Sequence, residues 1–275
     1  MKADIFYTSA PGRMAFNVIQ KLGFIKLSAW FLHTRLSKFM IKRFIEKNGI
    51  DMTPFQGQEY RSFAGFFARK KKTGDFDRED SVLISPCDSL LSVYDVEDDM
   101  SIPMKGSVYT LKDLVTDPDK AELFRGGLCM VFRLQASDYH HFCFFDDGYM
   151  TETHYVPGQL HSVQPIACES VPVYRLNRRW WSIMDTLHFG KAAQIEVGAM
   201  AVGGLGLTME KGSFRRGDEM GGFELAGSTI VVLLQEPVRR RLRLYPRYMP
   251  ACGGQAEVRA CMGQGIGRLM KENDR

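Results

Sequence analysis

The chain has 275 residues, of which 45% are apolar and 25% charged, so a sizeable core is expected and disordered or fibrous structure is excluded for most of the chain. Its 36 basic residues exceed its 32 acidic residues by too little to indicate a nucleic-acid partner. The six cysteines form no C-x-x-C pair, which favours reduced thiols, and we expect neither a signal peptide nor a membrane-spanning helix.

The first patterned segment, Arg13 to Lys47, is the most basic part of the chain. Apolar side chains recur in it at helical spacing and predict one or two amphipathic helices, with breaks at Gly23 and Gly49. Such helices either lie on an anionic membrane surface or pack on a core of their own with a solvated basic face. On the membrane interpretation, the side chains that would enter the interface are Phe24, Trp30, Phe31 and Phe39.

Residues 60–72 predict a further aromatic helix that ends in four consecutive basic residues. Residues 1–75 are therefore expected to form a helical, membrane-associating segment. From residue 76 onward, short β-branched and aromatic runs alternate with Gly, Pro and Asp turns, and we expect the last forty residues to be strands as well. The predicted fold class is α+β, with amphipathic helices followed by a β-rich, mostly antiparallel body over residues 76–275.

Reactive groups concentrate in three places in this body. Asp88 follows Pro86 at the start of an expected strand, although a turn aspartate bonded to its own backbone is a common alternative. The segment SDYHHFCFFDDG contains His140, His141 and Cys143, and one histidine is expected to be structural. A zinc site and a Cys143 nucleophile are both weakly supported, because the ligand spacing has no matching second pair and buried cysteine is commonly inert. We therefore predict no metal.

The third place is the turn Ala226-Gly227-Ser228-Thr229, which opens into a strongly apolar strand. An ordinary turn is the simple interpretation. A serine that follows glycine in a sharp turn can also aim its hydroxyl at the preceding carbonyl, since glycine has no Cβ to block the approach. Attack converts the amide to an ester, and elimination and hydrolysis leave a pyruvoyl group, a carbonyl electron sink made from the chain itself.

Read together, these segments resemble the phosphatidylserine decarboxylase family. The resemblance covers roughly residues 55–270 and keeps the family's order of motifs. The matching stretches are Ser62 to Lys72, Ser85 to Asp88, Asp138 to His140, Val156 to Val163, Asn177 to Arg179, Phe189 to Ala199 and Lys211 to Thr229.

The resemblance implies self-cleavage between Gly227 and Ser228 into chains 1–227 and 228–275. Ser228 would become the covalent pyruvoyl cofactor that forms a Schiff base with the substrate amine. It also implies that Asp88 is a charge-relay aspartate and that His140 is the processing base. The family's Y-H-x-x-H pattern departs here, because Cys143 replaces the second histidine. His161 is the reserve candidate for the base.

The implied activity is decarboxylation of phosphatidylserine to phosphatidylethanolamine by a lyase made as a zymogen. We expect a peripheral protein on the cytoplasmic side of the cell membrane, where anionic phosphatidylserine is substrate and docking surface together. The cleaved small chain is the expected partner, and a homodimer is expected from the family alone. The alternatives are a lipid-surface binding module of the same fold that does not process itself, and a metal- or Cys143-dependent hydrolase.

Overall fold

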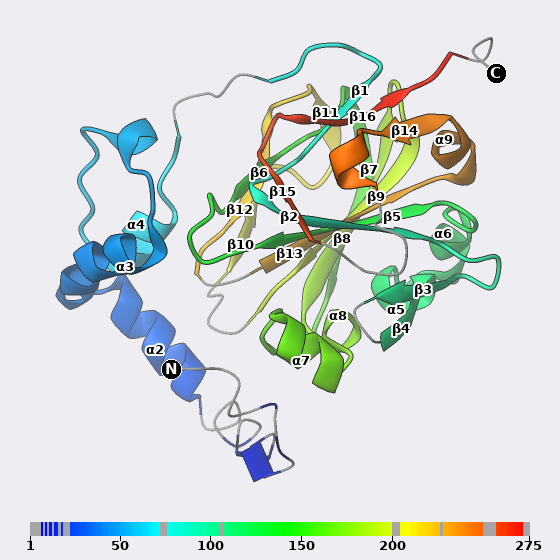
Figure 1. Ribbon diagram of the computed structural model, residues 1–275. Helices are drawn as coiled ribbons and strands as arrows, with labels where there is room; N and C mark the ends of the chain where they lie inside the picture. The colour runs from blue at the N-terminus through cyan, green and yellow to red at the C-terminus, as the bar shows by residue number, and fades with distance from the viewer. Residues whose placement is uncertain are drawn as a thin grey trace.

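Short helices come first in the chain and antiparallel sheets follow, which confirms the predicted α+β class (Figure 1). The computed structural model describes residues 7, 9, 11, 12, 14, 15, 18, 23–71, 76–104, 107–199, 204–225, 228–249 and 257–271. In the described part of the chain, no helix is long and apolar enough to cross a bilayer. The first helices are α2 (Phe24–His33), η2 (Arg35–Phe39), α3 (Met40–Asn48), η3 (Thr53–Phe55) and α4 (Phe63–Phe67).

The two glycines expected to break the basic helices do so. Gly23 precedes α2 with φ 76°, and Gly49 ends α3 with φ 60°, a left-handed conformation that glycine adopts without a Cβ penalty. One side of these helices packs around Phe63, Phe66 and neighbouring side chains in a small core. The other side leaves large apolar side chains in solvent, and these are Phe24, Leu27, Trp30, Leu36 and Phe39.

The aromatic helix is shorter than predicted. It ends at Phe67, before the basic run, and two cations of that run, Arg69 and Lys71, turn inward. The buried Arg69 guanidinium lies 4.9 Å from the ring centroids of both Phe55 and Phe66, and the Lys71 ammonium turns inward to an aspartate. Cation–π contact and ion pairing thus stabilise two charges that the sequence pattern places at a helix end.

An eight-stranded antiparallel sheet, in the order β11-β7-β8-β9-β13-β5-β2-β15, is the centre of the body. Its strand β13 is buried along its whole length and pairs with β5 on one side and β9 on the other. A continuous apolar run is what a strand covered on both faces requires. The strands of this sheet are β2 (Ser89–Asp95), β5 (Leu128–Leu134), β7 (Gly148–Val156), β8 (Arg179–Thr186), β9 (Gly190–Val197), β11 (Gly212–Phe214), β13 (Ser228–Leu234) and β15 (Val258–Ala260).

Smaller sheets accompany the large one. The sheet β10-β12-β6 packs on it, since Gln194 of β9 lies 3.0 Å from the Met220 sulfur of β12. Figure 1 shows α2 to α4 beside the body, on the side of β6, β10 and β12. The remaining strands are β1 (Val82–Ile84), β3 (Ser101–Met104), β4 (Ser107–Thr110), β6 (His141–Cys143), β10 (Leu205–Leu207), β12 (Glu219–Phe223), β14 (Leu242–Leu244) and β16 (Gly265–Leu269).

The body also contains helices at its periphery. The prediction that the last forty residues are strands joined by turns is wrong at helix α9, which begins at Glu236 and contains Arg239 to Arg241, and at the short helix η4. Proline is favoured in the first turn of a helix. The body helices are α5 (Leu111–Leu114), α6 (Pro118–Glu122), α7 (Pro165–Ser170), α8 (Val173–Leu176), α9 (Glu236–Arg241) and η4 (Pro246–Tyr248).

Candidate active site

Ser228 is the first residue of β13 and is fully buried. It pairs with Leu134 at the end of β5, and the next residue, Thr229, pairs with Arg133 and with Val197 of β9. The serine therefore lies where the central strands of the large sheet end, with β5 and β9 on either side of the start of β13. Gly227, the residue on the other side of the expected cleavage bond, lies outside the described residues.

Asp88 lies at the same end of these strands. It immediately precedes β2, in which Leu90 pairs with Arg133, the residue that Thr229 faces from the other side of β5. Strands are about 4.8 Å apart, so the starts of β2 and β13 are separated by about 10 Å across β5. The Asp88 carboxylate accepts hydrogen bonds from the Lys71 ammonium at 2.5 Å and from the Met262 amide at 2.9 Å.

His140 is fully buried, and its ring lies 4.1 Å from the ring of Phe67. Its Nδ1 lies 2.9 Å from the Asp138 carbonyl oxygen. A carbonyl only accepts hydrogen bonds, so Nδ1 carries the proton and Nε2 keeps its lone pair. No hydrogen-bond partner of Nε2 occurs among the described residues. Burial lowers the pKa of His140 to about 3, so the imidazole is neutral and can accept a proton.

The His140 backbone is held beside the strand that leads to Ser228. Its carbonyl accepts a hydrogen bond from the Phe223 amide at 2.9 Å, at the end of β12. The Asp138 carbonyl orients the His140 ring, whereas Asp88 bonds to Lys71 and Met262. The predicted residues Asp88 and Ser228 thus lie at the same end of the strands of the large sheet, and His140 lies at the entry to β6, beside the end of β12.

His161, the reserve candidate, is linked to the same end of the strands through the side chain of Asn177. Its amide donates to the Asn177 side chain at 2.8 Å, and Asn177 donates to the carbonyl of Gly198 at 2.7 Å. Gly198 follows Val197 and is therefore level with Ser228 across β9 and β13. Burial lowers the pKa of His161.

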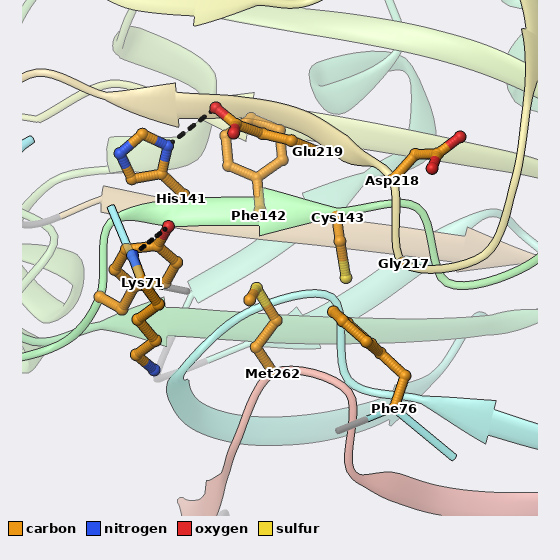
Figure 2. Close-up of a pocket in the computed structure, with 10 residues that line it drawn as sticks. Lys71, Phe76, His141, Phe142, Cys143, Gly217, Asp218, Glu219 and Met262 are labelled. Carbon is orange, nitrogen blue, oxygen red and sulfur yellow. Dashed lines mark hydrogen bonds and ion pairs between the residues drawn. The ribbon is translucent and has the colours of Figure 1, made fainter. Parts of the chain in front are cut away.

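A cavity of about 300 Å³ opens beside the Asp88–Lys71 pair. Figure 2 shows Lys71 and Met262 across it from His141 and Cys143. His141 lies 3.0 Å from a Glu219 carboxylate oxygen and 3.2 Å from the carbonyl of Ala68. The full lining is Lys71, Phe76, Tyr139, His141, Phe142, Cys143, Gly217, Asp218, Glu219 and Met262.

Comparison with known proteins decides the family. A family model described as phosphatidylserine decarboxylase matches residues 63–267. A phosphatidylserine decarboxylase proenzyme 2 from Clostridium acetobutylicum is 39% identical over 264 residues, which are 95% of this chain and 89% of the relative. A phosphatidylserine decarboxylase proenzyme from Clostridium kluyveri is 34% identical over 91% of this chain and 86% of the relative, and one from Clostridium perfringens is 36% identical over 84% and 81%.

The chain belongs to the phosphatidylserine decarboxylase family. The resemblance expected from the motifs is thereby confirmed, and the expected class, a carboxy-lyase, is the class of this family. The relatives are named as proenzymes, which agrees with the expectation of a zymogen.

In this family member, Cys143 stands where the resemblance implies a second histidine. The side chain is buried, and burial raises the pKa of its thiol well above the usual range, so the sulfur is neutral. A neutral thiol is a poor base and a poor nucleophile. The described residues contain no group of three or more His, Cys, Asp or Glu side chains that could hold a metal.

Sequence reasoning missed the partners of these residues. Lys71 is one of several cations in a row, and nothing in that run distinguishes it as the partner of Asp88. Glu219 pairs with both Lys70 and His141, from which it is 149 and 78 residues distant. Such long-range ion pairs depend on the tertiary structure and have no local signature.

Proposed function

We propose that this protein converts phosphatidylserine to phosphatidylethanolamine at a membrane surface, through a pyruvoyl group formed by self-cleavage between Gly227 and Ser228. Membership of the decarboxylase family supports the activity, and the proenzyme names of its relatives support processing. The observation that carries the site assignment is the position of Ser228. It is a buried serine at the start of a central strand, in the region where a neutral, base-form histidine lies.

In the proposed processing step, the Ser228 hydroxyl attacks the Gly227 carbonyl carbon. The hydroxyl proton passes to Nε2 of His140 and from there to the Ser228 nitrogen, so that the C–N bond breaks as the ester C–O bond forms. β-Elimination then releases the Gly227 carboxylate, and hydrolysis of the remaining enamine releases ammonia and leaves the pyruvoyl group. A buried site suits this chemistry, because limited access of water protects the ester from direct hydrolysis before the elimination. We propose that Asp88 acts on this region as a fixed negative charge, held by Lys71 and the Met262 amide.

The surroundings of Ser228 fit a small carbonyl group in place of the serine side chain. Buried polar atoms of the body without a hydrogen-bond partner among the described residues include Nε2 of His140. Buried polar atoms normally have partners, so these are available to a ligand or a bound group. A pyruvoyl group there would supply the electron sink that accepts the carbon–carbon bonding pair when carbon dioxide leaves.

Residues 1–75 are the proposed membrane-associating segment and residues 76–275 the decarboxylase domain. Five large apolar side chains point into solvent from α2, η2 and its end, each more than half exposed. Lysines and arginines of the same helices would attract an anionic bilayer. Docking on the surface lets the enzyme act on a head group without extracting two acyl chains, which costs about 0.8 kcal/mol per methylene.

A denaturing gel and intact mass measurement test this proposal. The purified protein should run as two fragments, residues 1–227 and 228–275, and the smaller one should react with hydroxylamine at its blocked N-terminus. Ser228→Ala and His140→Ala should stay uncut, whereas Cys143→Ser should be cut normally. A single intact wild-type chain without carbonyl reactivity would refute processing and favour the lipid-binding module. Prompt cleavage of His140→Ala would move the base to another residue.

A further inference from the structure

Glu196 is a fully buried acid that the processing chemistry does not use. It lies in β9, and its Oε1 accepts a hydrogen bond from the Gln194 amide at 3.0 Å. Its Oε2 is also buried and has no hydrogen-bond partner among the described residues. Acids are rarely buried without a cation or several donors, because an uncompensated charge in the interior is costly.

The register of the sheet turns this acid toward Ser228. Glu196 pairs directly with Ile230, and directly opposed residues of antiparallel strands point to the same face. Ile230 and Ser228 are two residues apart in β13, so they also share that face. Glu196 and Ser228 are therefore diagonal neighbours, with Cα atoms about 7–8 Å apart. A glutamate side chain spans much of that distance.

The surroundings keep Glu196 uncharged. Its paired residues on β8 and β13 are Trp180 and Ile230, and Met220 of β12 contacts its partner Gln194. None of these neighbours carries a charge. The basic residue on this face of the sheet is Arg178, two residues before Trp180, and its side chain packs against Gly198. Burial raises the pKa of Glu196 to about 8, so the carboxyl group holds its proton at neutral pH.

The pKa values of the two buried groups, His140 and Glu196, are thus shifted in opposite directions. His140 is neutral with a free lone pair, which suits a base, but it has no second proton to give at neutral pH. Glu196 is neutral with a proton, which suits an acid. Decarboxylation needs an acid, because the carbon that loses carbon dioxide must gain a proton. Opposite shifts at neighbouring titratable groups are the usual basis for separate acid and base roles in one site.

We propose that Glu196 is the proton donor of the decarboxylation, and that His140 is the base of the self-cleavage. The inference rests on the proposed function. In this step the C–C bond to the carboxylate breaks, its electron pair is retained on the substrate side, and carbon dioxide departs. The proton on Oε2 forms the new C–H bond, and the Glu196 carboxylate regains a proton from water as the product leaves.

Glu196→Gln tests the assignment, because it keeps the shape and a hydrogen-bond donor but has no acidic proton. The variant should cleave itself as completely as wild type on a gel, while its kcat falls about 100-fold or more with KM little changed. Gln194→Met is the matched control: it removes the hydrogen bond to Oε1 and keeps the proton, so it should retain most of the activity. Wild-type activity in Glu196→Gln, or failure of that variant to cleave, would overturn the division of roles.

A second measurement does not depend on activity. Infrared difference spectroscopy of the wild-type protein should show the band of a protonated carboxyl group at pH 7 that disappears as the pH rises through about 8. The same band should be missing from Glu196→Gln. Absence of any such titrating band in wild type would refute the proposal. Failure of wild type to cleave itself at all would instead refute the proposed function.

Discussion

Replacing two exposed aromatic side chains of the helical segment should detach the protein from membranes. Trp30 is 66% exposed and Phe39 is 75% exposed, so both can enter a bilayer interface without rearrangement of the helices. Full burial of such a side chain is worth about 1.5–3 kcal/mol, and the exposed parts of the pair together about 2–4 kcal/mol. Since 1.4 kcal/mol is tenfold in affinity, the double variant Trp30→Ser, Phe39→Ser should bind vesicles at least about 30-fold more weakly.

Sedimentation with vesicles that contain phosphatidylserine measures this affinity. The matched control is Leu187→Ser, which removes a side chain that is 68% exposed on the turn between β8 and β9. The control should bind as wild type does, and both proteins should keep the circular dichroism spectrum of wild type. Equal loss in the control, or unchanged binding of the double variant, would show that the helical face is not the membrane contact.

Three further outcomes are expected. Gly222→Ala should lower the free energy of unfolding, measured in urea, by about 1–3 kcal/mol, since the new Cβ would lie 2.8 Å from the ring of His141. The control Gly206→Ala lies in the paired strand, where the new Cβ meets no atom within 4 Å, and should change this free energy by less than about 0.5 kcal/mol. Lys71→Met should lower the free energy of unfolding by about 1–3 kcal/mol, because it removes the ion-pair partner of the largely buried Asp88. The control Lys42→Met changes an 88% exposed side chain and should lower it by less than about 0.5 kcal/mol. The rate of self-cleavage should stay level as the pH falls through 6.5, because a base with a pKa of about 3 remains unprotonated there; a loss of rate near pH 6.5 would exclude His140.

The helix breaks and the main strands were predictable because their signals are local. Gly23 and Gly49 take the left-handed conformations that end helices, and the apolar run after Gly227 forms a buried strand. The end of α4 was not predictable. Arg69 leaves the helix pattern because two aromatic rings accept its guanidinium, and that contact exists only after the chain has folded.

The candidate site divides in the same way. Motif order predicts Asp88, His140 and Ser228 as site residues, and the register of β2, β5 and β13 brings two of them to the same end of the strands. Glu196 could not be selected, because an acid in an expected strand is ordinarily assigned to the solvent face. Only the cross-strand pairing with Ile230 and the second sheet above it show that this face is interior.

The place of β13 has a consequence for the fate of the two fragments. A cut before Ser228 would make β13 the first strand of the shorter fragment. In the sheet, β13 pairs with β5 and β9 of the longer fragment on both sides over nearly its full length. The pieces could come apart only by tearing the sheet through its middle. Each molecule would therefore retain the pyruvoyl group that it formed and could not exchange its short fragment with another molecule. Chemical loss of that single group would inactivate the molecule permanently.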